Sequence, residues 1–140
     1  MIKIGRISDI GTDFDENLLI VRSAKNIPKH AVWEPLLSPS KQLFHSYLEA
    51  KKAGWFDENW FQQNYVPQFL HEMASSHAAR DLLNRLYVDS RSRNILLACY
   101  CTDEKLCHRS ILAGMLLGAG ASIECIADYR KYWDMFRQIT

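Results

Sequence analysis

The fold of this chain is constrained most by a set of short apolar runs separated by stretches with helical periodicity. The runs cover residues 18–21, 95–101 and 121–126, and residues 1–7 form a fourth, looser one. A short run without polar alternation is typical of a strand that is covered on both faces. Buried strands joined through helices predict a mainly parallel sheet flanked by helices, so we expect a three-layer α/β domain.

The middle of the chain carries the start and stop signals of helices. Ser38-Pro39-Ser40 is a typical helix start, and apolar side chains follow it at helical spacing until Gly54. Asp57 is placed to cap a second helix, in which Pro67 predicts a kink or a break. Ser75-Ser76 predicts the start of a third helix. These helices form an insertion between the second and third of the predicted strands.

The remaining segments are interpreted from the same signals. Residues 24–38 contain Pro28 and show no clear period, so we expect a loop. Residues 107–117 and 128–138 are expected to be helices. The last helix carries aromatic side chains that either pack on the sheet or form the face of a homodimer, namely Tyr129, Tyr132, Trp133 and Phe136.

Composition places the chain among ordinary globular domains. It has 140 residues, of which 48% are hydrophobic and 24% are charged, and we expect one domain over residues 1–140. The formal net charge of +1 argues against nucleic acid as a partner, because that binding needs a basic surface. No apolar run approaches the roughly 20 residues that span a bilayer, and charges interrupt the N-terminal apolar stretch. We therefore expect a cytoplasmic protein without a membrane partner.

The four cysteines, Cys99, Cys101, Cys107 and Cys125, are expected to be free thiols in a reducing compartment. Cys99 lies inside a predicted strand and is interpreted as a buried thiol, and Cys101 shares its face if the strand continues. Their spacing does not match the paired-ligand motifs of structural zinc sites. We therefore expect no metal site and no cofactor.

The segment from Cys101 to Ser110 leaves a buried strand and enters a helix. In parallel α/β sheets ligands bind at the carboxyl ends of the strands, and the N-terminus of a helix attracts anions. Cys107 at this helix start is expected to have a lowered thiol pKa and to be a nucleophile, with Cys101 as the second candidate. His108 is a candidate general acid or base.

Two arginines are candidate ligands for an anion. The forked guanidinium of Arg109 suits phosphate or carboxylate, and Ser110 adds a hydroxyl donor. Arg22 directly follows the strand at 18–21, so it is expected at the same sheet edge if that strand and the one at 95–101 are parallel neighbours. The alternative is that Arg109 pairs with an acidic residue of the preceding loop and that Arg22 is a surface residue.

The helix start Cys107-His108-Arg109-Ser110 resembles that of the domain of unknown function 488 family. Upstream pieces in the same order are similar to its YeaO-like branch: Arg22 after an early strand, Trp33, the helix start at 37–40, Trp60-Phe61 and Tyr65. The resemblance covers about residues 17–126. One departure is Val21, which stands where the family often has an acidic residue. The resemblance implies the fold and the place of the site, and the family carries no settled activity.

The residues leave two functions open. In the first, an enzyme or sensor binds an anionic small molecule such as a nucleotide through Arg22, Arg109 and Ser110, and a reactive cysteine acts on it. In the second, a non-catalytic module binds a small molecule or a protein, and the cysteines are structural. No complete catalytic constellation can be written from the sequence, so it does not decide whether the protein is an enzyme.

Overall fold

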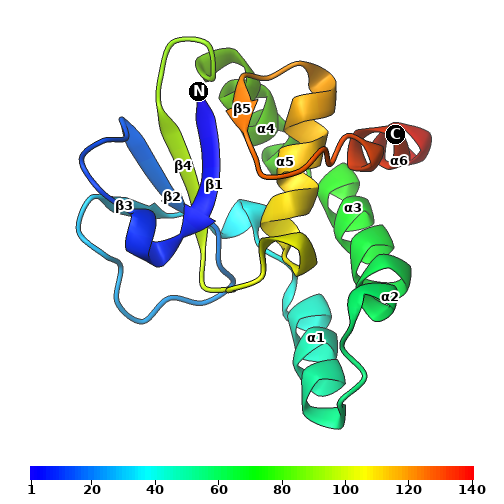
Figure 1. The fold of residues 1–140 in the computed structure, drawn as a ribbon. Coiled ribbons are helices and arrows are strands. Elements are labelled where there is room, and N and C mark those ends of the chain that lie inside the picture. The colour runs from blue at the N-terminus through cyan, green and yellow to red at the C-terminus, as the bar shows by residue number, and fades with distance from the viewer.

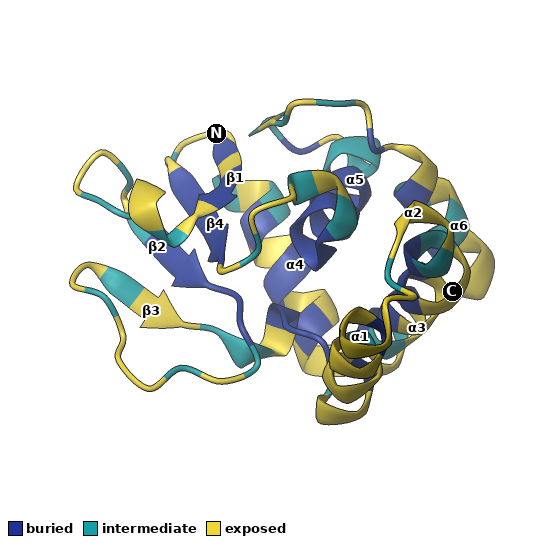
Figure 2. Cartoon of the chain, turned by 60° about the horizontal axis from the view of Figure 1, so that its bottom comes forward, coloured by how far each residue is buried: buried dark blue, intermediate teal, exposed yellow.

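The computed structural model describes residues 1–140, and its centre is a parallel five-stranded sheet (Figure 1). The strands lie in the order β3-β2-β4-β1-β5. Their bounds are β1 Ile2–Arg6, β2 Glu16–Leu19, β3 Ala31–Trp33, β4 Ile95–Cys99 and β5 Ile123–Glu124. Every pairing between neighbours is parallel, which confirms the predicted α/β class. The α-helices lie on one side of the sheet, so the third of the three expected layers consists only of the short 3-10 helix η1 (Ile7–Asp9) on the other side (Figures 1 and 2).

The strands follow the apolar runs, with differences at their ends. All five residues of the central strand β4 are buried, as its continuous apolar run predicted. However, β4 ends at Cys99, two residues before the predicted end. The edge strand β3 lies in the segment that was expected to be a loop. Its residues Val32 and Trp33 are exposed, so burial imposes no hydrophobic pattern there.

The predicted helix starts are confirmed. Helix α1 (Lys41–Ala53) begins at Ser40, whose hydroxyl accepts the Leu43 N–H, and it ends at Gly54 with φ of 80°. Helix α4 (His77–Asp89) begins at Ser76, which caps it in the same way. No helix of the structure combines the length and the hydropathy needed to cross a bilayer.

The helix that Asp57 caps is irregular rather than broken. It consists of α2 (Glu58–Trp60), a π-helical segment η3 (Phe61–Tyr65) and α3 (Val66–Ser75), which follow one another without a gap. Pro67 lies in the first turn of α3, directly after the π-helical segment. The wider turns of that segment accommodate the missing N–H of the proline, so the predicted kink takes the form of a π-bulge.

Helix α5 (His108–Ala119) is buried along most of its length and packs beside the sheet (Figure 2). Helix α6 (Lys131–Ile139) covers its outer side. Two glycines make this approach close, because a Cβ on Gly114 would overlap the Tyr129 carbonyl and a Cβ on Gly118 would overlap the Trp133 side chain. The aromatic residues of the last segment therefore pack on α5.

Glu16 connects β2 to two other segments at the amino end of the sheet. Its carboxylate accepts hydrogen bonds from Arg85 of α4 at 2.8 Å and from Arg93, just before β4, at 2.9 Å. The hydrogen bond from Arg85 is the main cause that lowers the pKa of Glu16, and partial burial opposes it. The charged form of Glu16 is therefore the one that the fold stabilises.

We predict that Gly114→Ala destabilises the protein by about 1–3 kcal/mol, because the added methyl group overlaps backbone that cannot move aside. In an open helix the same change stabilises by about 1 kcal/mol, so the clash decides the sign. Urea denaturation measures the difference. Gly11→Ala is the control, because nothing lies within 4 Å of its added Cβ. Equal stability of the Gly114→Ala protein and the wild type would contradict the close packing of Tyr129 on α5.

We predict that Glu16→Gln lowers the melting temperature at pH 7 and loses this effect in acid. The folded-state pKa of Glu16 lies below its ordinary value of 4.5. Its stabilisation is therefore present above that value and is lost as the pH falls through the folded pKa. The arginines are partly exposed, so the effect at pH 7 is at most about 1 kcal/mol. Thermal melts of both proteins from pH 7 to pH 3 test this, and a constant difference would contradict it.

Candidate functional site

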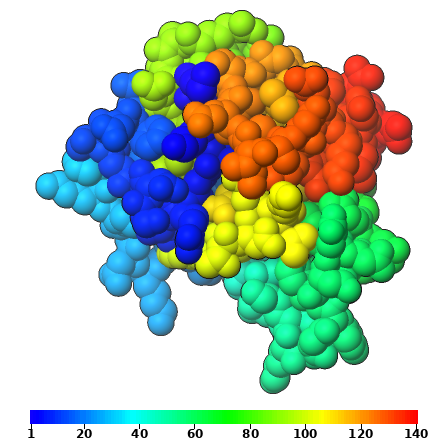
Figure 3. Space-filling model, in the orientation of Figure 1, coloured from blue at the N-terminus to red at the C-terminus, as the bar shows by residue number.

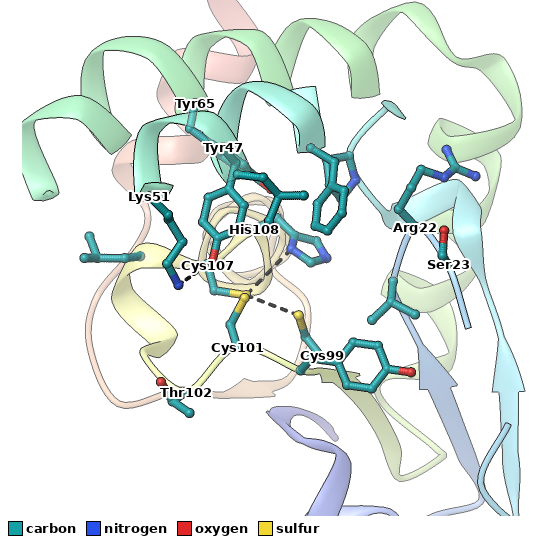
Figure 4. Close-up of a pocket in the computed structure, with 16 residues that line it drawn as sticks. Arg22, Ser23, Tyr47, Lys51, Tyr65, Cys99, Cys101, Thr102, Cys107 and His108 are labelled. Atoms are coloured by element: carbon teal, nitrogen blue, oxygen red, sulfur yellow. Dashed lines mark hydrogen bonds between the residues drawn. The ribbon is translucent and has the colours of Figure 1, made fainter. Parts of the chain in front are cut away.

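A cavity of about 350 Å³ opens at the carboxyl ends of β2 and β4 (Figure 4). Its lining comes from the residues after each strand, 21–23 and 99–102, from the start of α5, and from one face of α1. The strands β2 and β4 are parallel neighbours, so the residues that follow them meet at one edge. In the space-filling view the segment around residues 100–110, in yellow, lies between the N-terminal residues and the green helices (Figure 3).

Three thiols meet at the floor of this cavity. The Sγ atoms of Cys99, Cys101 and Cys107 lie within 4.8 Å of one another, and the Sγ atoms of Cys99 and Cys107 are 3.5 Å apart. The chain turns after Cys99, and the 3-10 helix η4 (Glu104–Leu106) leads it back to the start of α5. Cys99 and Cys107 are buried, whereas Cys101 is only partly covered. Cys101 is therefore the thiol of the cluster that a molecule in the cavity can reach.

The three thiols of the cluster differ in pKa, because burial and the neighbouring thiols affect each of them differently. The thiol of Cys107 and then that of Cys99 lower the pKa of Cys101 well below its usual value, against the effect of burial. Burial raises the pKa of Cys107, which corrects the expectation of a lowered value at this helix start. The N-terminus of α5 does not offset this rise in pKa, because the Cys107 sulfur is removed from water. The pKa of Cys99 is raised to about 11, mainly by its hydrogen bond with Cys101.

Helix α1 supplies a wall that the sequence interpretation missed. Lys51 Nζ donates a hydrogen bond to the Tyr47 hydroxyl at 3.1 Å, and that hydroxyl contacts the Cys101 sulfur. Burial and then the charge of Cys101 raise the pKa of Tyr47. Phe44 and Leu48, which belong to the apolar side chains at helical spacing, line the cavity and are 37% and 46% exposed. The signal was a lysine at the fourth position after Tyr47, on the same helix face.

His108 lines the cavity but is fixed by the backbone. Its Nε2 lies 2.6 Å from the carbonyl oxygen of Ile20, which can only accept, so Nε2 carries the proton. Burial lowers the pKa of His108, which keeps the ring neutral. Its Nδ1 is therefore a lone pair, 3.6 Å from the Cys107 sulfur.

Arg109 and Ser110 lie outside the cavity, beneath its floor. Arg109 is 2% exposed, and its guanidinium donates to the carbonyls of Gly5 and Cys101. It forms no ion pair, so the acidic partner considered for it is not present. The hydroxyl of Ser110 donates to the Cys107 carbonyl at 2.8 Å and is fully buried. Both side chains hold the backbone that carries the thiols.

Arg22 lines the cavity at the sheet edge where the topology placed it. Its guanidinium points away from the cysteines (Figure 4). Its Nε is buried and has no hydrogen-bond partner. Arg22 therefore brings a positive charge to the rim of the cavity rather than to the thiols. Tyr65 lines the cavity, whereas the indole of Trp33 donates to the Val21 carbonyl.

We predict that Arg109→Met destabilises the protein by at least about 2 kcal/mol, because it removes hydrogen bonds from a buried carbonyl and from a partly buried one. Arg22→Met is the matched control and changes stability by less than about 0.5 kcal/mol, since its side chain is partly exposed. Urea denaturation of both variants tests the assignment. Equal stability of the two variants would contradict a structural role of Arg109.

Comparison with family models connects this geometry to other proteins. The chain matches the model described as the active DUF488-N3 subclade over residues 3–120. Comparison with curated proteins and with solved structures gives no match. The matched range contains all of β1 except Ile2, the strands β2 to β4, all residues that line the cavity and all of α5. The YeaO-like branch stays a prediction, but the resemblance to the family is confirmed, and the chain belongs to the DUF488 family.

Proposed function

We propose that the cavity binds a small molecule with an anionic group and that Cys101 is the nucleophile that reacts with it. The observation that carries this proposal is the position of Cys101, the one partly exposed thiol of a buried cluster, on the cavity floor. A nucleophile must be reachable from the ligand site and must have its charge stabilised. Both conditions favour Cys101 over Cys107, because Cys107 is buried.

The lining supports the choice of an anionic ligand. Lys51 and Arg22 contribute positive charge, and no aspartate or glutamate lines the cavity. The wall formed by α1 is mostly apolar and aromatic, and it includes Phe44, Tyr47 and Leu48. Small-molecule sites typically combine such a wall with few polar groups. A planar ring with a negatively charged substituent, as in a nucleotide, fits both features.

The surroundings of Cys101 support a thiol reaction. The neighbouring thiols of Cys107 and Cys99, and then the Tyr47 hydroxyl, lower the pKa of Cys101, which favours a negative charge on its sulfur. Tyr47, supported by Lys51, is the O–H group placed to donate a proton to a leaving group. In this proposal His108 is a positioning residue, because it contacts Cys107 and the Ile20 carbonyl.

The second candidate is a non-catalytic binding module with structural cysteines. The burial of Cys99 and Cys107 favours it, because two of the three thiols are out of reach of a ligand. The two candidates differ in the reactivity of Cys101. A nucleophile reacts quickly with electrophiles, whereas a purely structural thiol does not.

We predict that Cys101 reacts faster than Cys125 with iodoacetamide and even more so with the anionic iodoacetate. Lys51 attracts the negative charge of iodoacetate, so Lys51→Met lowers the ratio of the two rate constants at Cys101 about fivefold, for a charge at about 4 Å in water. Mass spectrometry of the labelled peptides measures the rates. Lys52→Met is the matched control, because Lys52 is exposed and does not line the cavity.

The outcomes separate the parts of the proposal. Slower labelling of Cys101 than of Cys125 would overturn the nucleophile and favour the binding module. Equal effects of Lys51→Met and Lys52→Met would overturn the anion preference. Fast labelling with an effect confined to Lys51→Met supports both.

A further inference from the structure

We propose that Cys99, Cys101 and Cys107 together bind one thiophilic divalent ion of the zinc class. The inference uses the same sulfurs as the proposed function but does not depend on it, because binding an ion requires no reaction with a substrate. Soft thiolate ligands select such ions over magnesium or calcium.

The positions of the sulfurs fit a single ion. In a tetrahedral site with metal–sulfur bonds of about 2.3 Å, two sulfur ligands are about 3.8 Å apart. The Sγ atoms of Cys99 and Cys107 are 3.5 Å apart, and all three lie within 4.8 Å of one another. Small side-chain rotations therefore bring the three sulfurs to bonding distance. The fourth position then faces the cavity, through which the ion enters.

The neighbouring groups support a positive ion at this position. His108, the ring next to Cys107, directs its Nδ1 toward the cluster, 3.6 Å from the Cys107 sulfur, while its Nε2 donates to the Ile20 carbonyl. The ring therefore presents a nitrogen, rather than an apolar edge, to the sulfurs.

Charge balance favours a divalent ion over a monovalent one. Three thiolates with a divalent ion carry a net charge of −1, whereas three thiolates with a monovalent ion carry a net charge of −2. The environment can compensate a small excess: the N-terminus of the 12-residue helix α5 lies at Cys107, and the Arg109 guanidinium binds the Cys101 carbonyl. No acidic side chain lines the cavity to add to the excess.

The spacing of the cysteines did not predict this site. Zinc motifs are recognised as close pairs of ligands on short loops, whereas these sulfurs come from a strand end, the turn after it and a helix start. Only the return of the chain through η4 brings Cys107 to the end of β4. The ligand set is therefore a product of the fold.

The test is a titration of the reduced full-length protein with Cd²⁺, kept anaerobic with a phosphine reductant that does not bind the ion as a thiol would. The sulfur-to-cadmium absorption band should saturate at one ion per chain. A parallel sample is loaded with Zn²⁺ instead and passed through a gel-filtration column. Elemental analysis of the eluted protein should then find one Zn²⁺ per chain. A band without saturation at one equivalent, or loss of all zinc on the column, would overturn the inference.

Serine variants test the ligand assignment. Cys101→Ser is the main variant, because Cys101 is only partly buried and its replacement leaves the core packing intact. We expect it to weaken Cd²⁺ binding by at least about 100-fold, more than the loss of an outer contact. Cys125→Ser is the matched control and should bind as the wild type does. Wild-type affinity in Cys101→Ser, or weakened binding in Cys125→Ser, would overturn the assignment.

Failure of this inference is distinguishable from failure of the proposed function. Fast labelling of Cys101 without cadmium binding would leave the nucleophile and remove the ion. Cadmium binding at one equivalent with slow labelling of Cys101 in the ion-free protein would support the ion and remove the nucleophile.

Discussion

The buried guanidinium of Arg109 fixes the sheet edge on which the rest of the site depends. A permanent charge that is 2% exposed needs polar partners, and here two carbonyls accept hydrogen bonds from its Nη atoms, near the end of β1 and in the turn after β4, while its Nε has no partner. The contact holds the backbone of Cys101 against the neighbouring strand. It therefore sets where the chain turns, and with it the place of the exposed thiol in the cavity.

The first residues of α5 bind backbone carbonyls near the ends of three strands. His108 donates to the carbonyl after β2, and Arg109 donates to the carbonyls of Gly5 and Cys101. Ser110 donates to the carbonyl of Cys107 and secures the first turn of the helix itself. Polar side chains at a helix start thus take the place of an anionic ligand: they bind carbonyl groups of the protein. The consequence is a rigid floor that holds three sulfurs together.

The sequence predicts the parts of this structure that local chemistry determines. The caps at Ser40, Asp57 and Ser76 and the buried run of β4 follow from short-range rules. The edge strand β3 escaped prediction because exposure removes its pattern. The thiol cluster escaped because its spacing along the chain resembles no known ligand pattern. The cavity wall of Phe44 and Leu48 also escaped prediction, since an apolar stripe has the same spacing whether it faces a core or a cavity.

The two uses of the cluster exclude each other at any one moment, because the same electron pairs of Cys101 either attack a ligand or bind an ion. Cys99 and Cys107 are needed in both cases: as thiols they lower the pKa of Cys101, and as thiolates they hold the ion beside it. Binding of an ion releases their protons and removes this effect. Occupancy by an ion would therefore switch off the nucleophile completely, even where the cavity remains open to its ligand. A cluster of this design makes the reactivity of one exposed thiol depend on two buried ones that no ligand touches.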